Sequence, residues 1–154
     1  MACPFFMPIE KLENGAWPHP SRLPLGCGWS GHCTAPGHEG ELLQPEELHR
    51  CNLGYADSCR RMPQDRVWDA VRFAVRASTL RASDGVELLR RIEVQYVCER
   101  KHRPVEHGTL EFDTVSQTWL SMHGDARVQR MAECFLQVNR EKRITRAGSA
   151  SAAD

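Results

Sequence analysis

The sequence predicts an α+β protein: an irregular Cys-rich N-terminal module, then a 3–4-stranded antiparallel sheet packed by a C-terminal helix. Two observations lead to this prediction. Five of the seven cysteines fall within the first 59 residues, among many prolines and glycines. After residue 63, apolar and polar residues alternate in short successive runs, which is typical of strands with one buried face. We therefore expect a metal-binding module over 1–63, a sheet-and-helix domain over 64–146 and a disordered tail over 147–154.

The charge balance and the thiol content limit the function classes. The 154-residue chain has 20 Lys and Arg against 20 Asp and Glu, so it lacks the basic excess that nucleic acids and anionic membranes attract. We expect a protein partner, which the sequence does not identify. The N-terminus lacks the apolar stretch of a signal peptide, which predicts a cytoplasmic protein with reduced thiols. Clustered cysteines in that compartment favour metal binding or catalysis over disulfides.

The dense prolines and glycines of the N-terminal module predict little regular structure. The module nevertheless contains apolar residues such as Phe6 and Trp29, and a bound metal would supply the organisation that backbone pairing does not. One helix is expected over about 45–52, because Pro45 suits its first position and Gly54 its C-terminal cap. A second helical turn is expected from Ala56 to Arg61.

The C-terminal part predicts a meander of strands joined by short connections. The expected strands cover 71–77, 92–98, 108–113 and 118–121, with a turn at 83–85 and a break over 101–108. Asp125 is expected to cap the helix that follows. Its apolar stripe has helical spacing and consists of Val128, Met131, Ala132, Phe135 and Val138.

Four cysteines are the predicted metal ligands because each lies beside a predicted turn or helix end, or at the start of the chain. They are Cys3, Cys33, Cys51 and Cys59, with Cys27, His32, His38 and His49 in reserve. Cys3 is preferred over Cys27 because a Cys-Pro pair occurs in iron–sulfur motifs. Cys98 and Cys134 lie on predicted apolar faces and are expected to be buried core residues.

The spacing of the cysteines favours an iron–sulfur cluster, of the 4Fe–4S type, over zinc. The gaps between the first five are 23, 5, 17 and 7 residues, whereas structural zinc sites use closely spaced pairs. The expected role is electron transfer, redox sensing or structure. The alternatives are a zinc-stabilised interaction module without redox activity, or cysteines that bind no metal. Arg60 and Arg61 beside Cys59 favour a thiolate or an anionic cluster.

A second constellation allows a metal-dependent hydrolase. His102, Glu106 and His107 lie within six positions, and a metal held there could activate a water. Pro104 interrupts any helix through this segment, so the spacing of an H-E-x-x-H site is absent. The chain also lacks the nucleophile elbow of serine hydrolases and the phosphate-binding glycine loops. No catalytic motif is therefore recognised.

Overall fold

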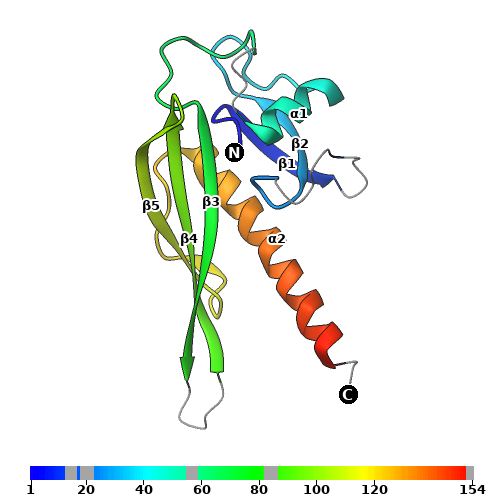
Figure 1. Cartoon of the computed structure of the whole chain (residues 1–154), viewed down its shortest axis with the longest axis vertical. Coiled ribbons are helices and arrows are strands. Elements are labelled where there is room, and N and C mark those ends of the chain that lie inside the picture. The colour runs from blue at the N-terminus through cyan, green and yellow to red at the C-terminus, as the bar shows by residue number, and fades with distance from the viewer. Residues whose placement is uncertain (13–16, 18–22, 55–58, 82–86, 152–154) are drawn as a thin grey trace.

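The computed structural model describes the chain except for residues 13–16, 18–22, 55–58, 82–86 and 152–154. The elements are β1 (Phe6–Leu12), β2 (Gly28–Cys33), α1 (Pro45–Leu53), β3 (Ala70–Arg81), β4 (Glu87–Arg100), β5 (Arg103–Asp113), β6 (Thr118–Trp119) and α2 (Ala126–Ser151). The fold is α+β, with a two-stranded sheet, a four-stranded sheet and a C-terminal helix (Figure 1).

The larger sheet is the antiparallel meander that the alternating pattern predicts. Its strands are ordered β3-β4-β5-β6, and Val94 of β4 pairs with Val75 on one side and Leu110 on the other. Ile92, Val94 and Leu110 are buried on one face of this sheet. The predicted turn over 83–85 lies outside the described residues.

The β4–β5 hairpin corrects the prediction of a break over 101–108. Only Lys101 and His102 form the turn, with φ of 49° and 61°, and residues 103–107 belong to β5. Two-residue turns with both φ positive usually contain Asn and Gly, so this sequence carries no turn signal. Pro104 is accommodated where the register shifts between Cys98 and Glu99, since a bulge tolerates proline.

The N-terminal part is more regular than its proline content predicts. β1 and β2 pair antiparallel, with Phe6 opposite Cys33 and Pro8 opposite Gly31. Both strands of a two-stranded sheet are edge strands. A proline such as Pro8 is tolerated there when its nitrogen faces the unpaired side, because it then removes no hydrogen bond between the strands. A Cβ at Gly31 would lie 2.3 Å from the Met7 carbonyl oxygen, so glycine is required for this close pairing.

The predicted helix over 45–52 is confirmed as α1. Its Glu47 carboxylate accepts the N–H of Gln44 at 3.0 Å, and Pro45 occupies the first turn. The helix ends at Gly54, whose N–H donates to the carbonyl of Arg50. Of the second helical turn predicted over Ala56 to Arg61, residues 56–58 lie outside the described residues, and Arg60 and Arg61 form a turn rather than a helix.

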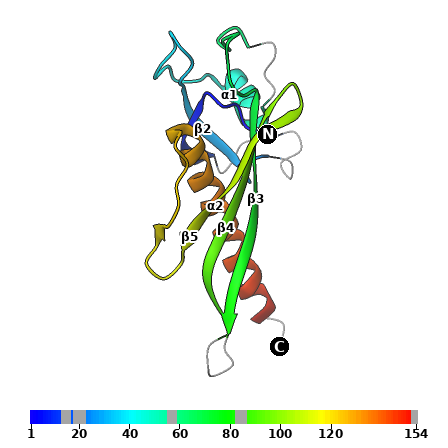
Figure 2. The same cartoon turned by 90° about the vertical axis from the view of Figure 1, so that its left-hand side faces the viewer.

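Helix α2 lies against one face of the larger sheet and beside β1 (Figures 1 and 2). Asp125 caps it as predicted, because its Oδ1 accepts the N–H of Arg127 at 2.8 Å. The predicted stripe is buried, and one continuous core joins residues of both sheets to the helix. The helix continues to Ser151, so residues 147–151 of the expected tail are helical. None of the described helices is long and apolar enough to cross a membrane.

Candidate metal centre

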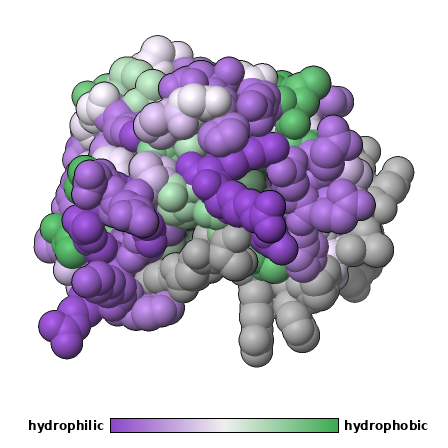
Figure 3. All heavy atoms as spheres, turned by 90° about the horizontal axis from the view of Figure 1, so that it is seen from above, coloured by the Kyte–Doolittle hydropathy of each residue, from purple (hydrophilic) through white to green (hydrophobic). Residues whose placement is uncertain are grey.

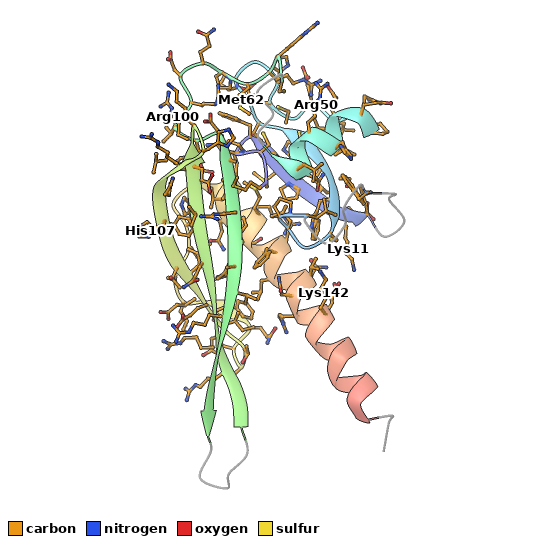
Figure 4. All side chains as sticks on the ribbon, in the orientation of Figure 1. Lys11, Arg50, Met62, Arg100, His107 and Lys142 are labelled. Atoms are coloured by element: carbon orange, nitrogen blue, oxygen red, sulfur yellow. The ribbon has the colours of Figure 1, made fainter. Side chains whose placement is uncertain are left out.

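The four cysteines predicted as ligands all line one cavity of about 460 Å³. Their segments are far apart in the sequence: the chain start, the end of β2, the last turn of α1, and the segment after α1. Arg50 and Met62, which also line the cavity, lie at the upper end of the molecule (Figure 4). Seen from above, hydrophilic residues surround a paler, more apolar area (Figure 3).

Backbone hydrogen bonds join the segment around Cys3 to two other elements. The preceding Ala2 exchanges two hydrogen bonds with Val71 of β3, at 2.7 and 2.9 Å, and the N–H of Cys3 donates to the carbonyl of Cys51 at 2.9 Å. The chain start is thereby joined to both β3 and α1. This pairing fixes Cys3 beside Cys51 through the backbone alone.

Asn52 connects the helix that carries Cys51 to the strand that ends at Cys33. Its amide exchanges two hydrogen bonds with the backbone of Trp29, both at 2.9 Å, and donates a third to the Leu48 carbonyl. The side chain is 1% exposed. A buried amide with three partners fixes the distance between α1 and β2.

Three of the four thiols are removed from solvent. Cys3, Cys33 and Cys51 are 5%, 6% and 8% exposed, whereas Cys59 is half-buried. Cys59 begins a turn in which its carbonyl accepts the N–H of Met62 at 3.1 Å. The cavity is therefore deep on the side of Cys3 and reaches the surface near Cys59.

The sulfur atoms at the deep end have hydrogen-bond donors. The pKa of Cys3 lies below its ordinary value because its Sγ accepts a hydrogen bond from the Cys51 thiol, and the N–H groups of Phe5 and Phe6 act in the same direction against burial. The same Cys3–Cys51 bond, followed by burial, raises the pKa of Cys51.

At Cys33, burial outweighs the effect of the hydrogen-bond donor on the pKa. Burial raises the pKa of its thiol, although the N–H of Ala35 opposes this by donating to Sγ at 3.4 Å. Backbone donors of this kind stabilise sulfur in its anionic form. Cys3 and Cys33 thus both have backbone N–H donors aimed at sulfur.

Arg61 is the cationic side chain most firmly fixed in the cavity wall. Its Nη2 lies 2.7 Å from a carboxylate oxygen of Glu47 and 3.3 Å from one of Glu41. Its Nη1 is buried and has no hydrogen-bond partner among the described residues. Arg50 and Arg60 also line the cavity, but both are exposed.

The structure separates Cys27 from the cavity. This half-buried thiol has Lys11, Glu141 and Lys142 as its charged neighbours, and burial raises its pKa to about 11. Lys11 on β1 and Lys142 on α2 both lie lower on the molecule than Arg50 and Met62 (Figure 4). Of the two possible fourth ligands, Cys3 is the one that lies with Cys33, Cys51 and Cys59.

Cys98 and Cys134 are core residues, as the sequence predicts. Both are fully buried in the cluster between the sheet and α2. Burial raises the pKa of each to about 12. They serve as packing groups there.

Of the reserve histidines, only His38 lines the cavity, where its Nδ1 lies 3.1 Å from a carboxylate oxygen of Glu41. His32 neighbours Cys33 on β2, so strand alternation directs it to the other face. His49 stacks on Trp17, with ring centroids 5.6 Å apart. His32 and His49 are therefore outside the cavity lining.

Within the described ranges, no three His, Cys, Asp or Glu side chains lie close enough together to hold a single metal ion. The Cys3 and Cys51 thiols lie within hydrogen-bond distance of each other. Together with Cys33 and Cys59 they line one cavity.

The histidine constellation is not drawn together. Glu106 and His107 are successive residues of β5, so they point to opposite faces of the sheet. Glu106 faces His123, with Oε1 and Nε2 3.1 Å apart, while His107 is exposed. The sequence pattern did not indicate His123, because this residue precedes α2 without any motif.

Asn52 and the two carboxylates that hold Arg61 were likewise not indicated by the sequence. Nothing in their local pattern distinguishes them from ordinary helical and loop residues, since their roles depend on which segments meet. The geometry is the basis for a functional assignment, because no protein family, no curated protein and no solved structure matches this chain.

Proposed function

We propose that the protein holds an iron–sulfur cluster of the 4Fe–4S type through Cys3, Cys33, Cys51 and Cys59, and that this cluster transfers electrons. The observation that carries the proposal is the convergence of four thiols from four separate segments on one cavity of about 460 Å³. Four cysteine thiolates are the usual ligands of such clusters.

The surroundings of the thiols support the binding of an anionic cluster. Backbone N–H groups donate to Cys3 and Cys33, and hydrogen bonds to the sulfurs are a principal influence on cluster potential. Arginines in the lining offset the negative charge of four thiolates.

The exposure pattern supports an electron-transfer role. Three ligands are buried, which shields a cluster from water, while half-buried Cys59 leaves one side close to the surface. An electron can then pass at the surface near Cys59 without the cluster being opened. The sequence has no substrate-binding motif to accompany the site, so we assign no further reaction to it.

The test is the iron, zinc and acid-labile sulfide content of anaerobically purified protein, together with its visible spectrum. We expect iron and sulfide in equal amounts and a brown protein that bleaches in air. Replacement of any one of Cys3, Cys33, Cys51 and Cys59 by Ser should reduce the iron content severalfold. Each substitution removes one thiolate from the ligand set.

The matched control is Cys27→Ser, because Cys27 is half-buried and belongs to the same part of the chain but lies outside the cavity. It should retain the full iron content, as should Cys134→Ala in the core. Zinc without sulfide would replace the proposal with a zinc-stabilised interaction module. Metal that survives Cys33→Ser but is lost on His107→Ala would instead indicate the histidine site.

A further inference from the structure

Two of the candidate ligands, Cys3 and Cys51, have thiols that lie within hydrogen-bond distance of each other. Both are free thiols in this structure, and they come from separate segments, the chain start and the last turn of α1. Cys33 differs, because its Sγ accepts the N–H of Ala35 in its own segment at 3.4 Å. Within the described lining of the cavity, Cys3 and Cys51 are therefore the thiols that are paired with each other.

Backbone contacts hold this pair of thiols in place. The N–H of Cys3 donates to the carbonyl of Cys51 at 2.9 Å, and the N-terminal ammonium of Met1 donates to the carbonyl of Leu53 at 3.3 Å. Residues joined by such backbone bonds have Cα atoms ~5.5 Å apart, and disulfides join residues whose Cα atoms are about 4.4–6.8 Å apart. The two sulfur atoms can therefore bond to each other by rotation of their side chains, while the backbone keeps its position.

The cavity gives a small oxidant a route to the pair. Cys3 and Cys51 both line it and are 5% and 8% exposed, and the cavity reaches the surface near half-buried Cys59. Hydrogen peroxide oxidises one thiol to a sulfenic acid: an S–O bond forms, the O–O bond breaks and water leaves. The second thiol then attacks that sulfur, which forms the S–S bond and releases a second water. Two electrons pass in total from the sulfur atoms to the peroxide.

We propose that Cys3 and Cys51 form a disulfide in the cluster-free protein when a peroxide oxidises them, and that this bond blocks cluster assembly until a thiol reduces it. The blocking role rests on the proposed function, because the disulfide withdraws two of the four thiolates that hold the cluster. A reducing thiol reopens the site by thiol–disulfide exchange, in which its own sulfur becomes oxidised. The site is thereby filled under reducing conditions and closed under oxidising ones.

The first experiment exposes the cluster-free wild-type protein to a small molar excess of hydrogen peroxide and locates the disulfide by mass spectrometry. We expect two of the seven cysteines to lose their reactivity toward an alkylating reagent. Trypsin releases Cys3 in the peptide 1–11 but leaves Cys51 and Cys59 together in the peptide 51–60, so Cys59→Ser is analysed alongside. In that variant the link between the two peptides should persist, and it can involve only Cys51.

Two further substitutions, each made in the Cys59→Ser background, test the choice of partner. Cys51→Ser should lower the yield of the linked peptides by at least about tenfold, because Cys3 then lacks the sulfur within its reach. Cys33→Ser is the matched control, since Cys33 lines the same cavity and is similarly buried. It should leave the yield within about twofold of the background protein.

The second experiment measures cluster uptake by the wild type before and after oxidation. A preassembled 4Fe–4S cluster is supplied from a donor protein without free thiol or sulfide, and the iron and sulfide on the chain are measured after separation. The peroxide-treated protein should take up at least about tenfold less than the untreated protein. Treatment with a phosphine reductant, followed by its removal, should restore uptake to the untreated level.

The outcomes separate the two proposals. The absence of a disulfide, or one that joins Cys3 to Cys33 or Cys59, would overturn the assigned pair. A Cys3–Cys51 disulfide that leaves cluster uptake unchanged would overturn its blocking role. Untreated protein that takes up no cluster would overturn the proposed function and the blocking role with it, while a mapped Cys3–Cys51 disulfide would still support the redox pairing of the two thiols.

Discussion

At the scale of single residues, Asn52 has the largest structural role in the candidate site without being a ligand. It lies next to Cys51 in the sequence and bonds the backbone of Trp29, four residues before Cys33. Two ligand-bearing elements are thus held together by one side-chain amide. The positions of Cys51 and Cys33 relative to each other therefore depend on the Asn52 amide.

We expect Asn52→Ala to lower the free energy of unfolding by about 2–3 kcal/mol, because it leaves the buried N–H and carbonyl of Trp29 without partners. Chemical denaturation of the two proteins measures the difference. Asn139→Ala is the control, since the Asn139 amide donates to the Phe135 carbonyl within its own helix and bridges no second element. Equal losses for both variants would contradict the bridging role of Asn52.

At the scale of elements, the end of α1 is the most constrained point in the described chain around the site. Gly54 has φ of 69° and ψ of −177°, a conformation that is essentially confined to glycine. A Cβ there would lie 1.8 Å from the carbonyl oxygen of Met1. The chain start, with Cys3, and the helix end, with Cys51, can approach each other only because this position has no side chain.

Gly54→Ala should therefore lower the free energy of unfolding by more than about 2 kcal/mol, because it adds a steric clash to the conformational penalty. Gly40→Ala isolates that penalty, since Gly40 has φ of 80° and a Cβ added there would meet no atom within 4 Å. It should cost about 1 kcal/mol. Thermal unfolding of both variants measures the gap, and a Gly40→Ala loss as large as that of Gly54→Ala would refute the argument.

At the scale of the whole molecule, three of the candidate ligands, Cys3, Cys33 and Cys51, belong to the same buried core as the larger sheet and α2. The larger sheet and α2 bury apolar residues such as Val94 and Met131, and the region of the cavity is held in addition by the hydrogen bonds of Asn52 and Cys3. A bound cluster would add its binding free energy to the second region in particular. Stability should then differ between the two parts of the molecule.

Removal of the cluster with a chelator under an oxidant should accelerate amide hydrogen exchange in β2 and α1 by about tenfold or more. The amides of β4 and β5 should exchange at nearly unchanged rates, because the ladder between these strands contains none of the ligand-bearing segments. Mass spectrometry of peptides from the treated and untreated protein measures both. A uniform acceleration over the whole chain would show instead that the cluster supports the global fold.

The alternation of apolar and polar residues determined the main sheet, and the helical stripe determined α2, because burial of one face follows directly from residue order. Pro45 and Gly54 likewise determined α1. The positions of the cysteines beside turns and helix ends predicted the candidate ligands, and the Cys-Pro pair favoured Cys3 over Cys27. The proximity of Cys3 to the other three depends on the Ala2–Val71 pairing, which joins segments about seventy positions apart. The tertiary structure also decided the β1–β2 pair, the Lys101–His102 turn and the partners of Arg61, because each depends on which distant segments meet rather than on local pattern.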